Sequence, residues 1–133
     1  MSECLFCGIV AGEIPSRQVY SDDDAIAFLD IAPLHRGHSV IVPRDHVLDG
    51  TASPADWAKV APGIVAVSQA AKAKLGASGV NILSNAGAVS GQSVFHFHVH
   101  VIPRYDDNPG MEGLLKADRT AGDLDEVQRI MTA

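Results

Sequence analysis

The stretch FHFHVHV, residues 95–101, alternates an apolar side chain with a histidine at every second position. Successive side chains of a β-strand point to opposite faces of its sheet. As a strand, this stretch would place His96, His98 and His100 on one face and its phenylalanines and valines on the other. We expect the strand to cover Phe95–Ile102, with its apolar face packed against a helix.

Turn residues and short apolar runs elsewhere in the chain predict four more strands. A turn of three aspartates separates the first two and indicates a hairpin. Pro103 is expected to end the histidine strand. The four further strands are Gln18–Tyr20, Ala25–Leu29, Ser39–Pro43 and Val80–Ser84.

Three helices are expected around these strands. The longest begins after Ser53, an N-cap residue, and ends at Gly76. Pro62 lies inside it and is expected to kink or divide it. A short N-terminal helix is expected at Leu5–Ala11 and an amphipathic one at Asp123–Met131. Five short strands around one long helix, mostly linked as hairpins, predict the α+β class with a five-stranded antiparallel sheet.

The composition is that of a soluble globular protein. The chain has 133 residues, of which 47% are hydrophobic and 20% charged, and this length suits one domain with its own core. A formal charge of −6 provides no basic surface for a nucleic-acid backbone. Because no run approaches the ~20 apolar residues of a membrane span and the N-terminus lacks the basic flank of a signal peptide, we expect a cytoplasmic protein without a membrane partner.

Three histidines in one register need a chemical explanation. A strand rises ~3.3 Å per residue, so His96 and His100 would lie ~13 Å apart, too far for all three rings to share one metal ion with ease. Two of them could share one. A polar sheet face that happens to use histidine is the structural alternative. Neutral imidazoles are nucleophiles and proton carriers near neutral pH, and the loop at residues 85–93 offers glycines, hydroxyls and amides that can hold a phosphate.

Cys4 and Cys7 are the two cysteines of the chain and have the spacing CxxC. In a cytoplasmic protein this spacing indicates half of a metal site or a redox pair. A redox pair of the thioredoxin type follows a strand, and no strand is predicted before Cys4, so a metal is favoured. Two buried thiols without a ligand are the alternative.

Three segments of the chain resemble the histidine triad (HIT) superfamily. GQSVFHFHVHVIPR resembles the triad signature, and DIAPLHRGHSVIVPRDH and CLFCGIVAGEIPSRQVYSDDDAIAFLDI resemble two further regions of the family. The resemblance covers residues 4–105 and implies a HIT domain over residues 1–105, with the α+β fold expected above and a homodimer whose sheets join. The C-terminal tail, residues 106–133, lies outside the resemblance and is expected to pack on the domain or the dimer.

The resemblance also implies an activity. Family members hydrolyse or transfer nucleotides by attack of the middle triad histidine on an α-phosphate, which gives a nucleotidyl-histidine intermediate. By motif position His98 would be the nucleophile, His100 would bind phosphate and help to protonate the leaving group, and His38 would orient the triad. Asp30 would bind the ribose. The remaining substrate-binding residues implied are Phe6, Phe28 and Ile31 around the base and Asn85, Gly91, Gln92 and Ser93 around the phosphate and leaving group.

Some bacterial members of the family carry a structural zinc ion. The resemblance implies that its ligands here would be Cys4, Cys7, His46 and His96. Two thiolates and two imidazoles form a closed tetrahedral set, which is structural rather than catalytic. His35 matches no position of the family pattern and is expected on a surface loop. No organic cofactor is expected.

The favoured hypothesis is a small bacterial, Hint-like enzyme that cleaves phosphoramidates or acyl-adenylates of purine nucleotides such as adenosine. One alternative is a Fhit-like hydrolase of dinucleoside polyphosphates. Another is a nucleotide-binding interaction module with little turnover. A third is a zinc-dependent hydrolase that uses the histidines as catalytic metal ligands, which the strand geometry disfavours.

Overall fold

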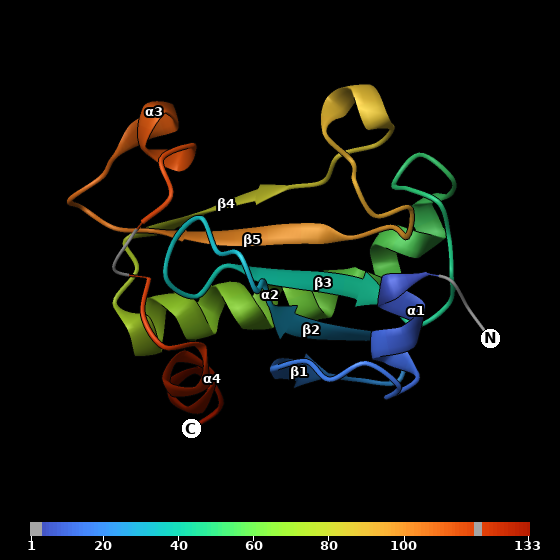
Figure 1. Cartoon of the computed structure of the whole chain (residues 1–133), viewed down its shortest axis with the longest axis horizontal. Helices are drawn as coiled ribbons and strands as arrows, with labels where there is room; N and C mark the ends of the chain where they lie inside the picture. The colour runs from blue at the N-terminus through green and yellow to red at the C-terminus, as the bar shows by residue number, and fades with distance from the viewer. Residues whose placement is uncertain (1–3, 119–120) are drawn as a thin grey trace.

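The computed structural model describes residues 4–118 and 121–133, and its centre is a five-stranded antiparallel sheet in the order β1-β2-β3-β5-β4 (Figure 1). The predicted α+β class is therefore confirmed. The strands are β1 Gln18–Ser21, β2 Ala25–Leu29, β3 Ser39–Pro43, β4 Gly79–Leu83 and β5 Val99–Arg104. The helices are α1 Leu5–Val10, α2 Pro54–Leu75, α3 Gly110–Leu114 and α4 Leu124–Thr132, with a 3₁₀ turn at Ala88–Ser90.

The long helix α2 has the ends that the sequence predicts. Ser53 caps it by accepting a hydrogen bond from the N–H of Ala55 at 3.2 Å, and Gly76 ends it with φ +75°. Pro62 lies inside the helix and does not divide it, so of the two expected effects division is wrong. Pro62 and Ala58, whose carbonyl loses its helical partner, are both exposed. Water can therefore take the place of the missing N–H.

Each face of the sheet has its own apolar core. The core on the α2 side contains Ala25, Ala27, Leu29, Ile41, Val60, Val67, Phe97, Val99, Val101, Val127 and Met131. The core on the α1 side contains Phe6, Ile9, Ile26, Phe28, Val40 and Val42. Alternate residues of β2 and β3 thus belong to different cores, which is the period of two expected of a sheet covered on both faces.

The histidine strand begins later than the sequence predicts. The ladder of β5 starts at Val99, and one backbone hydrogen bond joins the residues before it to the segment that follows β3. There the N–H of Phe97 donates to the carbonyl of Val47 at 2.7 Å. Phe97 is buried in the core beside α2 as expected, whereas Phe95 is 47% exposed. The expected strand over residues 95–98 is therefore wrong, although Phe97 and Val99 still face α2.

Pro103 does not end β5, contrary to expectation. It pairs with Val80 of β4 and lies beyond Val101, the last residue of β5 that pairs with β3. Proline is tolerated in a sheet where one neighbouring strand is absent. Arg104 then completes the strand by pairing with Gly79.

The C-terminal residues contribute to the packing. Val127 and Met131 of α4 are buried in the core beside α2. The short helix α3, which the sequence analysis did not predict, lies near the end of β5 (Figure 1). His35 was expected on the surface, but it is 2% exposed and hydrogen-bonded to α3, so that expectation is wrong. No helix among the described residues is long and apolar enough to cross a membrane.

Candidate active site and metal centre

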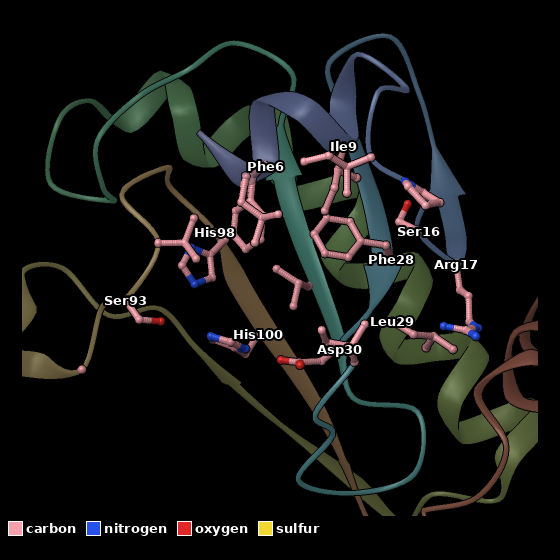
Figure 2. A pocket seen from close by; sticks show the side chains of 17 residues that line it. Phe6, Ile9, Ser16, Arg17, Phe28, Leu29, Asp30, Ser93, His98 and His100 are labelled. Carbon is pink, nitrogen blue, oxygen red and sulfur yellow. The ribbon is translucent and has the colours of Figure 1, made fainter. Parts of the chain in front are cut away.

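A cavity of about 290 Å³ lies between α1, the sheet and the loop that leads into β5 (Figure 2). Its walls are mostly apolar, and polar side chains gather at the end where β5 begins. An apolar slot with a few convergent polar groups is the usual form of a small-molecule site. The lining residues are Leu5, Phe6, Ile9, Ile14, Pro15, Ser16, Arg17, Phe28, Leu29, Asp30, Ile31, Val40, Gly91, Ser93, Val94, His98 and His100.

The structure places most of the candidate substrate residues around this cavity. Those that line it are Phe6, Phe28, Asp30, Ile31, Gly91, Ser93, His98 and His100. Asn85 and Gln92 do not line it. The Gln92 side chain is buried, and its amide accepts from the N–H of Gly87 at 2.8 Å and donates to the carbonyls of Leu48 and Val94. In this arrangement Gln92 shapes the loop.

Several walls of the cavity were not identified from the sequence. Ile9 and Ile14 come from α1 and the turn after it, and Val40 comes from β3. The alternation along β3 carried a signal for Val40, because Val40 and Val42 must share a face opposite Ile41. Ser16 and Arg17 lie at the end of the cavity away from His98 (Figure 2).

The ring of His98 is held in one tautomer. Its Nδ1 lies 2.8 Å from the carbonyl oxygen of His96. A carbonyl can only accept, so Nδ1 carries the proton and Nε2 keeps its lone pair. Burial lowers the pKa of His98 below the usual value, which keeps the ring neutral near pH 7. Phe6 packs edge-on against it with 4.9 Å between the ring centroids. His98 thus presents an uncharged, oriented nitrogen lone pair, which is what a nucleophile requires.

His38 and His100 form a second oriented pair. The N–H of Leu34 donates to Nδ1 of His38 at 3.1 Å, so His38 carries its proton on Nε2. That Nε2–H donates to Nδ1 of His100 at 2.9 Å, which leaves the proton of His100 on its own Nε2. Burial, and next the neighbouring His38 and His98, lower the pKa of His100 to about 4. His100 is therefore a neutral donor at the edge of the cavity.

Asp30 stands beside this pair. One carboxylate oxygen lies 3.6 Å from Nε2 of His38, and the other accepts from the N–H of Ala32 at 2.9 Å. Burial lowers the pKa of His38 more than the Asp30 charge raises it. Asp30 also lines the cavity next to His100 (Figure 2), so its carboxylate can accept hydrogen bonds from a ligand's hydroxyl groups.

A second cluster joins α1 to the segments around β3 and β5. One ligand atom from each of Cys4, Cys7, His46 and His96 lies within 4.8 Å of the others. The Nδ1 of His96 is 3.5 Å from the sulfur of Cys4 and 3.4 Å from that of Cys7, and Nδ1 of His46 is 3.3 Å from the sulfur of Cys7.

These distances fit a tetrahedral zinc ion. Zn–S and Zn–N bonds of ~2.3 and ~2.05 Å give S···N edges of about 3.6 Å in a tetrahedron. The Nε2–H of His96 donates to the carbonyl of Pro43 at 2.9 Å, so its bare Nδ1 faces the two thiols. Such a backbone partner typically orients a metal-bound histidine. The four residues therefore match zinc in both donor type and geometry.

Asp30, His38 and His100 are also close enough together to hold a metal ion. Metal binding through Nε2 of His38 would require that nitrogen to lose its proton. Its Nδ1 already accepts from Leu34, so the ring would become an anion or lose that hydrogen bond. This tautomer argues against the hypothesis of a catalytic zinc held by these histidines.

Comparisons with known proteins agree with this geometry. A family model of the HIT domain matches residues 11–107. Protein hit of Bacillus subtilis is 34% identical over 131 residues, which are 98% of this chain and 90% of that protein. The crystal structure of a Zn-bound histidine triad family protein from Mycobacterium smegmatis has a TM-score of 0.85 and 35% identity, covering 98% of this chain and 91% of that one. This chain therefore belongs to the HIT domain family, as its triad signature predicted.

A plant relative has a named activity. Adenylylsulfatase HINT3 of Arabidopsis thaliana is 39% identical over 105 residues, which are 77% of this chain and 53% of that protein. This relative is thus named for an action on an adenylyl compound.

The lowered pKa of His100 predicts that acid destabilises the fold. In the unfolded chain His100 binds a proton near pH 6.5, but in the folded protein only near pH 4. Between these values the unfolded state binds more protons, so the free energy of unfolding should fall as pH drops from 6.5 to 4. Urea denaturation at several pH values measures this.

The His100→Gln variant isolates this effect, because glutamine does not titrate and its amide oxygen can still accept from His38. We expect a shallower loss of stability in the variant between pH 6.5 and 4.5. Equal losses in both proteins would contradict the assignment to His100.

Proposed function

We propose that this protein is a nucleotide hydrolase or transferase that acts on the α-phosphate of purine nucleotides, with adenosine phosphoramidates and acyl-adenylates as substrates. The observation that carries the proposal is the pair of tautomers at one end of the cavity. His98 has a bare Nε2 and His100 has a proton on Nε2. One ring can attack phosphorus and the other can donate a hydrogen bond to the leaving atom, with no metal required.

In the first step Nε2 of His98 attacks the α-phosphorus. A P–N bond forms as the bond from phosphorus to the leaving group breaks, and Nε2–H of His100 donates a hydrogen bond to the departing atom. A carboxylate leaves as its anion, whereas an amine takes its proton from water. The imidazole of His98 becomes positively charged, and its Nδ1–H still donates to the His96 carbonyl, which stabilises that charge. Ser93 and the backbone at Gly91 line this end of the cavity and can donate to the phosphate oxygens.

In the second step a water molecule attacks the same phosphorus and the P–N bond breaks. The proton of the attacking water passes to the solvent as AMP forms, and His98 returns to its neutral form. The hydrogen bond from His38 holds His100 in the orientation in which its Nε2–H faces the reacting groups. We assign the ribose hydroxyls to Asp30 and the base to Phe6, Phe28 and Ile31, of which Ile31 is 83% exposed at the rim.

The size of the cavity favours a mononucleotide with a small leaving group. Its volume of about 290 Å³ is at the lower end for ligand pockets, which supports an adenylate over a dinucleoside polyphosphate. The similarity to a protein named adenylylsulfatase supports the same class of substrate. A panel of adenosine phosphoramidate, adenylyl sulfate and diadenosine polyphosphates tests this order of preference.

Replacing the nucleophile should abolish turnover but not binding. In the His98→Asn variant we expect AMP release from adenosine phosphoramidate to fall by at least about 1000-fold, because the covalent route is lost. The dissociation constant for AMP should change little, since base and ribose contacts remain. Steady-state kinetics and calorimetry measure the two quantities.

Full activity of His98→Asn would contradict the mechanism. Wild-type protein that binds AMP but turns over no substrate in the panel would instead support the hypothesis of a nucleotide-binding interaction module.

We also propose that Cys4, Cys7, His46 and His96 hold one structural zinc ion. The sulfur of Cys4 caps α1 by accepting from the N–H of Cys7, so the ion would fix the end of the helix that carries Phe6. A reducing cytoplasm, the location we propose for the protein, keeps such thiols available to zinc.

Zinc removal should destabilise the protein before it stops the chemistry. We expect one zinc per chain by elemental analysis and a lower melting temperature after treatment with EDTA, because a closed Cys₂His₂ site contributes to folding. Protein that stays folded in EDTA should still release AMP. Immediate, zinc-reversible loss of activity at an unchanged melting temperature would contradict a structural role.

The exposed edge of β4 supports the proposal of a homodimer. Within the described part of the chain no strand pairs with the outer edge of β4, and Ile82 is 51% exposed there. By contrast, α4 packs beside the other edge strand, where Gln128 donates to the carbonyl of Gln18 at 2.9 Å. An open edge is a template for pairing with a second chain.

Light scattering should give twice the chain mass of 14.0 kDa, and the single-chain mass would contradict the dimer.

A further inference from the structure

The loop between β2 and β3 carries a buried histidine that the proposed mechanism does not use. His35 is 2% exposed, and its Nε2 lies 2.9 Å from the carbonyl oxygen of Gly113 in α3. Because that oxygen can only accept, Nε2 of His35 carries a proton and donates it. The contact joins residues 78 positions apart in the chain.

The same loop supplies the hydrogen bond that orients the catalytic pair. The N–H of Leu34, the residue before His35, donates to Nδ1 of His38. The position of the Leu34 peptide therefore decides which nitrogen of His38 carries a proton. Through the His38–His100 hydrogen bond it also decides which nitrogen of His100 does.

Residues beyond β5 hold three successive residues of this loop. The N–H of Asp118 donates to the Leu34 carbonyl at 2.7 Å, and the hydroxyl of Tyr105 donates to the Arg36 carbonyl at 2.9 Å. His35 lies between them and donates to Gly113. Each bond fixes a different residue, so together they restrict both the position and the rotation of the Leu34 peptide.

The segment that holds the loop is itself anchored to β5. Arg104, the last residue of that strand, donates to the carbonyls of Asn108 at 2.7 Å and Gly110 at 2.8 Å. The side chain of Asn108 donates to the Gly113 carbonyl at 3.2 Å. A Cβ at Gly113 would overlap with the backbone oxygen of Asn108, so glycine is needed for this close approach. The partner of His35 is thus fixed to the strand that carries His100.

We propose that His35 is a positioning residue for the reaction and that it acts through Leu34, His38 and His100. If the loop shifts, Nδ1 of His38 loses its donor and is free to carry the proton itself. Nε2 of His38 would then accept from His100, whose own Nε2 would lose the N–H that donates a hydrogen bond to the leaving group. The residues after β5, including α3, are by this inference part of the support of the active site.

This inference rests on the proposed function only for its kinetic test. His35→Leu removes the N–H that donates to the Gly113 carbonyl and fills the buried position with an apolar side chain. His35→Gln can place an amide N–H where Nε2–H was. Val127→Ala is the matched control, because Val127 is fully buried in the core beside α2 and its aliphatic side chain makes no hydrogen bond to the loop. All three are compared with wild type at a temperature where each is folded.

Two readouts separate positioning from stability. We expect the kcat of His35→Leu to fall about 10- to 100-fold below that of wild type, while its affinity for AMP stays within about twofold. His35→Gln should recover most of the wild-type kcat, and Val127→Ala should keep it. Long-range proton–nitrogen NMR should show Nδ1 of His38 and His100 unprotonated in wild type and a mixture of tautomers in His35→Leu. Tyr105→Phe, which removes only the bond to Arg36, serves as a milder variant if His35→Leu does not fold.

Unchanged tautomers in His35→Leu would overturn the inference, whatever happens to the rate. So would a kcat that falls no further than in Val127→Ala, or a His35→Gln variant as slow as His35→Leu. If wild type turns over no substrate, the proposed function fails, and the tautomers alone decide the role of His35.

Discussion

One backbone contact decides the chemistry of each buried histidine around the cavity. A neutral imidazole has one proton to place, and a carbonyl or an N–H group at one nitrogen determines the state of the other. The His96 carbonyl leaves Nε2 of His98 bare, and the Leu34 N–H puts the proton of His38 on Nε2. Burial keeps these rings neutral by lowering their pKa values. The bare Nε2 of His98 and the N–H that His38 presents to His100 therefore follow from main-chain geometry.

The same rule divides the triad between two sites. The Pro43 carbonyl binds Nε2–H of His96 and turns its Nδ1 toward Cys4 and Cys7, away from the cavity. The carbonyl of His96 meanwhile orients His98. One residue thus contributes its ring to the candidate metal centre and its backbone to the cavity. Since Cys4 also caps α1, the candidate metal centre and the wall of the cavity share one short helix.

Local patterns predicted most of the fold because they act over a few residues. Ser39–Pro43 and Ala25–Leu29 were predicted with the bounds observed, and the caps of α2 were found at Ser53 and Gly76. His98 and His100, which the triad signature indicated as site residues, both line the cavity. What the sequence could not indicate depends on distant contacts. The ladder of β5 starts late because Phe97 bonds to Val47, and His35 is buried because α3 covers it.

The central claim is that two displacements take place at the α-phosphorus. His98 displaces the leaving group in the first, and water displaces His98 in the second. Each in-line displacement inverts the configuration at phosphorus, so two steps restore it. The most direct test is the hydrolysis of an adenosine phosphoramidate made chiral at phosphorus with sulfur, in water labelled with oxygen-18. The account predicts retention of configuration. Inversion would show that water attacks directly and would contradict the nucleotidyl-histidine intermediate.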